Sequence, residues 1–160
     1  MKTILLATDG SPSAELATHQ AIELAGATGR PLRVVTVWNT PIPLGYGYAA
    51  VPLPVELARL EREHAAEVAA RAVAAAAASG LKATSDVREG VAAEEICAAA
   101  TECEATIVVL GAHGWGAVKR FLFGSVSTRV MHEAPCPVLV VRADDTVVET
   151  RDHELLRAAP

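Results

Sequence analysis

Short apolar runs alternate along this chain with longer stretches in which apolar residues recur every three to four positions. Continuous apolar runs at residues 3–8, 31–38 and 105–110 predict strands that are buried on both faces. A weaker, alternating run at residues 83–88 predicts a strand at the edge of a sheet, and residues 137–141 form a last apolar strand. The pattern therefore predicts five strands.

Four helices are expected between these strands. Ser11 and Pro12 suit the N-cap and the first position of a helix that ends near Gly26 and Gly29. The other helices are predicted over residues 55–79, 92–102 and 125–132. In the longest helix, five residues at helical spacing are expected to form one face: Leu57, Leu60, His64, Val68 and Ala72. The four prolines within residues 39–54 predict a long loop before it.

Strands and helices alternate strictly along the chain. This order predicts an α/β fold with a parallel sheet and helices on both faces, and a length of 160 residues favours a single domain. Ligands in such folds bind beyond the carboxyl ends of the strands. Thr8 and Asp9 lie at one such end and Gly111 at another. They share a crevice only if the first and fourth strands are neighbours, which the pattern alone leaves open.

Composition and charge narrow the class of protein. Hydrophobic residues make up 51% of the chain, which excludes a disordered protein. The net charge of −5 argues against non-specific binding to nucleic acids or anionic membranes. No apolar run reaches the length of a membrane span, and the run after Met1 is too short for a signal peptide. Three cysteines without a secretion signal suggest reduced thiols, so a cytoplasmic protein is expected.

The segment between residues 110 and 127 carries the strongest functional signal. It joins the clearest buried strand to a helix, and it contains Gly111, Gly114, Gly116 and Gly124. Glycines allow the backbone to approach a ligand closely, and a helix start offers N–H groups that bind anions. The segment therefore predicts a phosphate site, although a glycine-rich surface loop would have the same local pattern.

Two common phosphate-binding motifs do not fit this segment. Gly111 and Gly116 have the spacing of a Walker A loop, but Ala117 stands where that motif requires lysine. Gly114 and Gly116 begin a dinucleotide fingerprint, which Lys119 interrupts. Neither motif therefore explains the segment.

Several side chains near these strand ends could contribute to a site. Asp9 could accept hydrogen bonds from a ribose or an adenine amino group, or simply form an Asp-Gly turn. Ser125 could cap its helix and also bind phosphate, while Val37 could lie against a base or belong to the core. His113 could contact phosphate or transfer a proton, but no partner acid is evident. The chain has no G-x-S-x-G elbow, no H-E-x-x-H motif and no metal-ligand spacing, so no catalytic residue is assigned.

Three motifs together carry a family resemblance. They are Asp9-Gly10-Ser11, the pattern Gly111-x-x-Gly114-x9-Gly124-Ser125, and the ending Cys136-Pro137-Val138-Leu139-Val140-Val141. With them, the chain resembles the universal stress protein family. The resemblance implies a Rossmann-like, open twisted sheet of five parallel strands in the order 3-2-1-4-5, which places strands one and four side by side. Residues 1–142 would form this nucleotide-binding domain, and residues 143–160 a C-terminal extension that is flexible or a short helix.

The intact glycine pattern resembles the ATP-binding branch of that family. By this resemblance, Ala7, Asp9 and Val37 would lie near adenine and ribose, and Leu110 and Gly111 would approach the ribose. The phosphates would be held by Gly114, Gly124, Ser125, Val126 and Ser127. A magnesium or manganese ion would be carried by the phosphates rather than by protein ligands. Ala7 departs from the proline found in some ATP-binding relatives.

The resemblance implies an ATP-binding protein that acts as a nucleotide-dependent switch in a stress response. It also implies a homodimer formed through the last strand, Val138–Val141. Two alternatives stay open: a dimeric interaction module of the same family that does not use nucleotide, and a slow ATPase in which Asp9 or His113 assists water. At most weak ATP hydrolysis is expected, and neither a nucleic acid nor a membrane is expected as a partner.

Overall fold

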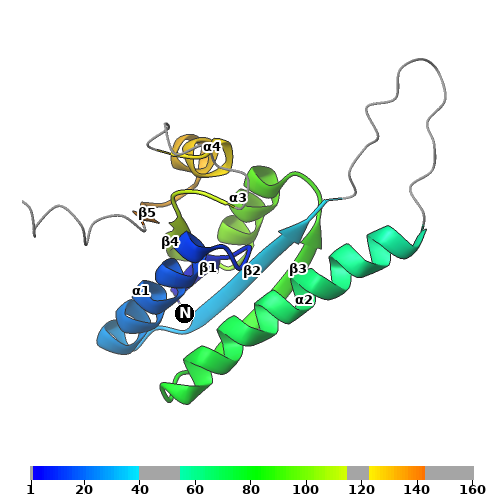
Figure 1. Ribbon diagram of the computed structural model, residues 1–160. Helices are drawn as coiled ribbons and strands as arrows, with labels where there is room; N and C mark the ends of the chain where they lie inside the picture. The colour runs from blue at the N-terminus through cyan, green and yellow to red at the C-terminus, as the bar shows by residue number, and fades with distance from the viewer. Residues whose placement is uncertain (1, 40–54, 115–122, 143–160) are drawn as a thin grey trace, which may run out of the picture.

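The computed structural model describes residues 2–39, 55–114 and 123–142 (Figure 1). Strands and helices alternate as the sequence predicts. Their bounds are β1 Thr3–Ala7, α1 Pro12–Thr28, β2 Leu32–Trp38, α2 Val55–Ala78, β3 Ala83–Glu89, α3 Ala92–Glu102, β4 Ala105–Gly111, α4 Ser125–Glu133 and β5 Val138–Val141. The predicted loop, except for Asn39, and the C-terminal extension lie outside the described residues.

The five strands are parallel and lie in the order β3-β2-β1-β4-β5. β1 is the central strand. Ala7 pairs with Val35 of β2 on one side and with Leu110 of β4 on the other. The carboxyl ends of β1 and β4 are therefore adjacent, which confirms the expected order and brings Asp9 and Gly111 to the same end of the sheet.

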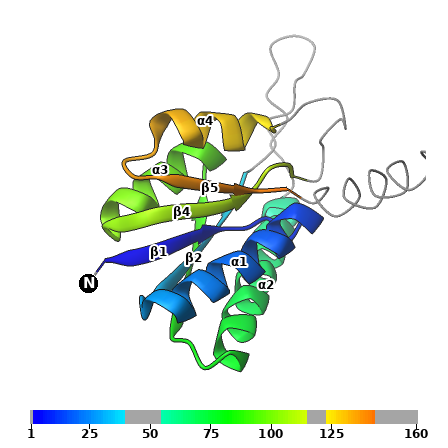
Figure 2. The ribbon, with the colours of Figure 1, turned by 90° about the vertical axis from the view of Figure 1, so that its left-hand side faces the viewer.

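The sheet is buried between two pairs of helices (Figure 2). α1 and α2 cover one face, where Ile4 and Leu6 of β1 pack with alanines from both helices. α3 and α4 cover the other face, where Leu5 packs with Ile96 and Val130. Because successive side chains of a strand point to opposite faces, the continuous apolar sequence of β1 supplies both cores.

Helix α1 passes through Gly26, near which the sequence predicted that it would end. A Cβ at Gly26 would meet no atom within 4 Å. A single glycine inside a helix costs only about 1 kcal/mol relative to alanine, and burial of the neighbouring Ala25 offsets this cost. The helix ends at Gly29, whose φ of 64° lies in the left-handed region that favours glycine.

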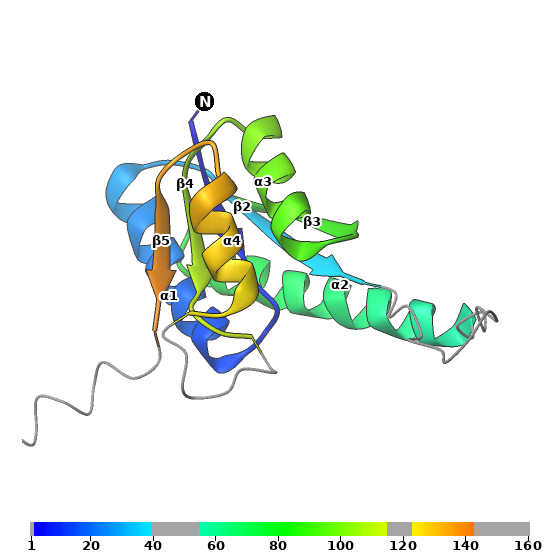
Figure 3. The same cartoon turned by 90° about the horizontal axis from the view of Figure 1, so that it is seen from above.

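The buried face of α2 differs from the predicted one. Leu60 is 49% exposed and His64 is also exposed, although Val68 and Ala72 are buried as predicted. The described side chains of this helix are buried only from Ala65 onward. The reason is that the amino-terminal half of α2 runs past the ends of the strands (Figure 3). The large apolar side chains of α2 did not predict its buried face, because alanines form most of the contact with the sheet.

Candidate functional site

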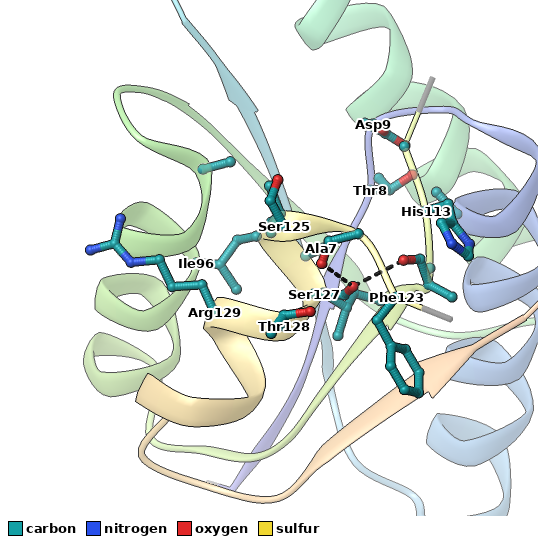
Figure 4. A pocket seen from close by; sticks show the side chains of 18 of the residues that line it. Ala7, Thr8, Asp9, Ile96, His113, Phe123, Ser125, Ser127, Thr128 and Arg129 are labelled. Carbon is teal, nitrogen blue, oxygen red and sulfur yellow. Dashed lines mark hydrogen bonds between the residues drawn. The ribbon is translucent and has the colours of Figure 1, made fainter. Parts of the chain in front are cut away.

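A cleft of ≈ 750 Å³ opens at the carboxyl ends of β1 and β4, beside the amino-terminal ends of α3 and α4 (Figure 4). Small-molecule sites commonly have volumes of about 300–1,000 Å³. The cleft brings together all ten residues for which the family resemblance implied a nucleotide contact. They are Ala7, Asp9, Val37, Leu110, Gly111, Gly114, Gly124, Ser125, Val126 and Ser127.

At the end of β1, Asp9 forms the turn that leads into α1. Its Oδ1 accepts a hydrogen bond from the N–H of Ser11 at 3.0 Å, and Asp9 is exposed where it lines the cleft. A Cβ at Gly114 would stand 2.7 Å from Asp9 Oδ2, so the carboxylate lies directly against the glycine loop. The turn interpretation and the ligand interpretation of Asp9 are therefore compatible in this geometry.

The carbonyl group of Ala112 joins the two ends of the glycine loop. It accepts hydrogen bonds from the N–H of Gly124 at 2.7 Å and from the hydroxyl of Ser127 at 2.9 Å. The N–H of Ala112 donates to the carbonyl of Val141 in β5 at 2.7 Å. The start of the loop is thus tied both to the first turn of α4 and to the edge of the sheet.

The next carbonyl group, that of His113, is held by α1. The hydroxyl of Ser11 donates to it at 3.1 Å, and the hydroxyl of Ser13 donates to it as well. Ser11 occupies the predicted N-cap position of α1 but makes no capping hydrogen bond. The predicted N-cap position is therefore confirmed, and the hydrogen bond that the hydroxyl makes is to the glycine loop.

Helix α4 opens onto the cleft without a side-chain cap. Its N-cap is Gly124, with an extended backbone, and Ser125 is its first residue, so the expectation that Ser125 caps the helix is wrong. The N–H groups of Ser125, Val126 and Ser127 have no partner within the helix, and its first turn contains no acidic residue. The positive end of the helix dipole therefore faces the cleft.

The two serines in this first turn contribute differently. Ser127 is 2% exposed, and its hydroxyl hydrogen-bonds to the carbonyls of Ala112 and Gly124. Ser127 therefore offers its N–H to the cleft rather than its hydroxyl. Ser125 is exposed where it lines the cleft, so its hydroxyl is accessible to a ligand.

The glycines of the motif are required for close packing rather than for backbone conformation. None of Gly111, Gly114 and Gly124 has a positive φ. A Cβ at Gly111 would stand 2.5 Å from Ser13 Oγ and 2.7 Å from the backbone nitrogen of Ala14. The close approach that the sequence predicted at Gly111 is thus made by α1, although Gly111 also lines the cleft.

One part of the cleft is apolar. It is lined by Val35 and Val37 of β2, by Ile96 of α3 and by Leu110 of β4. Val35, Ile96 and Leu110 are at most 5% exposed, and Val37 is half-buried. An apolar surface beside a helix start allows the cleft to take a ligand that is apolar at one end and anionic at the other.

Sequence reasoning placed Thr8 at the strand end beside Asp9, but it missed other residues that line the cleft, including Ile96, Phe123 and Thr128. Ile96 belongs to the core and also lines the cleft, because the two are continuous. Thr128 directly follows Ser127 and Phe123 directly precedes Gly124, so sequence adjacency to predicted site residues was the available signal for both.

Arg129 also lines the cleft, but two carboxylates hold its guanidinium. Its Nε donates to Glu133 at 2.8 Å, and its Nη2 donates to Glu94 of α3 at 2.8 Å. These hydrogen bonds raise the pKa of Arg129 above its ordinary value. Because Glu133 and Glu94 already pair with this guanidinium, the groups among the described residues that could receive an anion in the cleft are mainly backbone N–H groups.

Metal and thiol chemistry find little support in the part of the chain that the structure describes. Within that part, no group of three or more His, Cys, Asp or Glu side chains could hold a metal ion. Cys97, Cys103 and Cys136 are half-buried free thiols, and burial raises the pKa of each, which favours the unreactive protonated form.

None of the described helices is both long enough and apolar enough to cross a membrane.

Comparison with known proteins agrees with this fold and motif. The model of the universal stress protein family matches residues 1–142. A universal stress protein of Thermus aquaticus is 40% identical over 141 residues, covering 88% of this chain and 98% of that protein. Among solved structures, universal stress protein UspA from Lactobacillus plantarum has a TM-score of 0.77 and 27% identity, covering 88% of this chain and 97% of that one. A universal stress protein from Archaeoglobus fulgidus in complex with dAMP has a TM-score of 0.62 and 26% identity, with coverage of 88% and 97%. This chain therefore belongs to the universal stress protein family.

Proposed function

We propose that this chain binds an adenine nucleotide, ATP in the first place, and acts as a nucleotide-dependent switch in a stress response. The observation that carries the proposal is the uncapped start of α4 beside a cleft with an apolar wall. An adenine nucleotide matches this cleft, because its phosphates are anionic and the flat faces of its base can lie against an apolar wall.

In this proposal the phosphates are bound by backbone N–H groups at the start of α4. Ser125, Val126 and Ser127 supply these groups, and Gly114 and Gly124 complete the loop around them. Backbone amides at a helix start attract anions without carrying formal charge, which suits a chain with a net charge of −5. Ser125 can add its exposed hydroxyl, whereas Ser127 contributes only its N–H.

The base and the ribose would occupy the part of the cleft near β1, β2 and β4. Ala7, Val37 and Leu110 offer apolar surface to the adenine. Asp9, at the end of β1, offers a carboxylate that can accept hydrogen bonds from ribose hydroxyls or from the adenine amino group. Gly111 lies beside Leu110, on the ribose side of the proposed site.

A magnesium or manganese ion, if one accompanies the nucleotide, would be carried by the phosphates. The described residues contain no group of three candidate ligands that could hold a metal by themselves. Phosphate oxygens commonly supply such ligands to magnesium in nucleotide sites.

The relative solved with dAMP supports the class of ligand. That protein, at 26% identity to this chain, holds a nucleotide with an adenine base and one phosphate group. The choice of ATP over a monophosphate rests on the glycine motif, which resembles that of the ATP-binding branch of the family.

The proposal can be tested by calorimetric titration of the purified protein with ATP and with adenosine. Ser125→Asp places a carboxylate at the first position of α4, where it stabilises the helix by about 0.3–1 kcal/mol but repels a phosphate. We expect its melting temperature to be at least that of the wild type, and its affinity for ATP to fall by about tenfold or more.

Met131→Asp is the matched control, because it adds the same charge to an exposed position of α4 that does not line the cleft. We expect it to bind ATP within about twofold of the wild type. Absence of ATP binding by the wild-type protein at millimolar concentration, or unchanged binding by Ser125→Asp, would contradict the proposal.

A homodimer through β5 belongs to the same proposal. β5 is an edge of the described sheet, and Leu139 within it is 36% exposed. An edge strand with an exposed apolar side chain is a surface on which a second strand can pair. Light scattering after size-exclusion chromatography should give a dimer for the wild type and a monomer for Leu139→Lys, and a monomeric wild type would dismiss the dimer.

A further inference from the structure

We infer that Ser11 and Ser13 are positioning residues that set the affinity for the phosphate part of the nucleotide without touching it. The inference rests on the proposed function. Both serines are buried, with exposed fractions of 1% and 5%, and neither lines the cleft. Any effect on binding must therefore pass through the residues that they hold.

Both hydroxyls converge on the backbone of His113. Ser11 Oγ donates to the His113 carbonyl at 3.1 Å, and Ser13 Oγ donates to the same carbonyl. Ser13 Oγ also accepts a hydrogen bond from the N–H of His113 at 3.3 Å. Because Ser13 engages both backbone groups of one residue, it fixes the position and the orientation of His113 relative to α1.

His113 lies between the two residues that shape the proposed phosphate loop. Before it, Ala112 holds the N–H of Gly124 at the start of α4. After it, Gly114 lies against the carboxylate of Asp9. A displacement of His113 would therefore move Gly114 and weaken the hydrogen bond by which Ala112 ties the loop to α4.

The side chain of Ser11 contacts the glycine loop and not its own helix. A serine at an N-cap normally accepts a hydrogen bond from its own helix, which contributes about 1 kcal/mol to stability. Ser11 makes no such bond, and its hydroxyl reaches a residue 102 positions away in the sequence. The hydrogen bond that the Ser11 hydroxyl makes is thus to the loop and not to its own helix.

The test is to measure the dissociation constants for ATP and for adenosine in the wild type, Ser11→Ala and Ser13→Ala. Loss of the Ser13 hydroxyl, which makes two of these hydrogen bonds, should weaken ATP binding by about tenfold, and loss of the Ser11 hydroxyl, which makes one, by about threefold. Adenosine has no phosphate, so its affinity should stay within about twofold. A general loss of fold would weaken both ligands alike, and the comparison separates the two effects.

Thr18→Ala is the matched control. Thr18 lies in the same helix, is 7% exposed, and donates from its hydroxyl to the carbonyl of Ala14 at 2.8 Å. The substitution removes a buried hydroxyl hydrogen bond of similar kind that does not reach the loop. Its binding of both ligands should equal that of the wild type.

Unchanged ATP binding by both serine variants, or an equal loss for ATP and adenosine, overturns this inference and leaves the proposed function intact. If Ser13→Ala does not fold, the same two criteria apply to Ser11→Ala alone, with an expected loss of about threefold for ATP. A wild-type protein that binds no ATP overturns the proposed function, and this inference with it.

Discussion

Replacing Gly111 with alanine tests why the motif begins with glycine. The added Cβ would stand 2.5 Å from Ser13 Oγ, and 2.7 Å both from the carbonyl carbon of Ser13 and from the nitrogen of Ala14. Ordinary van der Waals contact begins at 3.4 Å, so the backbone of α1 would have to retreat by roughly 0.7 Å. Two of the three clashing atoms belong to the helix backbone, which cannot move alone.

The magnitude follows from this geometry. Inserting a methyl group into a well-packed site costs about 1–3 kcal/mol. Moving α1 would also weaken the hydrogen bonds between Ser13 and His113, at a cost of about 1 kcal/mol. We therefore expect Gly111→Ala to lower the free energy of unfolding by about 2–4 kcal/mol.

Urea unfolding followed by circular dichroism measures this loss. With a slope of about 2 kcal/mol per molar, the midpoint should fall by about 1–2 M. Gly26→Ala is the control, because a Cβ there meets no atom within 4 Å. Alanine at that helical position should stabilise the protein by about 0.5–1 kcal/mol. A Gly111→Ala protein as stable as the wild type would refute the reasoning.

Two further predictions concern a buried hydroxyl and an edge-strand ion pair. Thr36 Oγ1 is buried without a hydrogen-bond partner in the described part of the chain, so Thr36→Val should raise the free energy of unfolding by about 1–2 kcal/mol in urea, and a less stable variant would count against this. Burial raises the pKa of Asp86, but hydrogen bonds from Arg88 and Arg33 outweigh burial and hold that pKa below its ordinary value. Because the folded pKa lies below the unfolded value of about 3.9, the stabilisation is complete at pH 7 and is lost as the pH falls through the folded pKa. The stability advantage of the wild type over Asp86→Asn should therefore shrink between pH 7 and pH 3, and a difference independent of pH would argue against these ion pairs.

The elements of the fold could be predicted because their signals are local. β1 and β4 are continuous apolar runs, and Ser11-Pro12 marks the start of α1 through the conformations that these two residues prefer. The adjacency of β1 and β4 had no local signal, since strand order depends on packing between distant segments. The family resemblance supplied it, and the register between Ala7 and Leu110 confirms it.

The details of the site were harder to predict, because tertiary contacts redirect groups that have local alternatives. Ser11 was expected to cap its own helix, yet it donates to His113, and no property of the sequence near residue 11 indicates that partner. Gly111 was expected to let a ligand approach the backbone closely, and its lack of a side chain also lets α1 pack against it. Leu60 was expected on a buried face, but α2 extends past the sheet at that point. In each case the type of residue indicated a role in packing or hydrogen bonding, but the sequence did not indicate what the residue would contact.

The central claim is that backbone N–H groups at the start of α4 hold the phosphates of an adenine nucleotide. Its most direct test is an NMR titration of the 15N-labelled protein with ATP and, separately, with adenosine. We predict that ATP shifts the amide resonances of Gly114 and of residues 124–127 most strongly, and that adenosine leaves these resonances nearly unchanged while shifting Val37 and Leu110. The claim is contradicted if millimolar ATP leaves the amides of residues 124–127 unmoved, or if ATP and adenosine shift them equally.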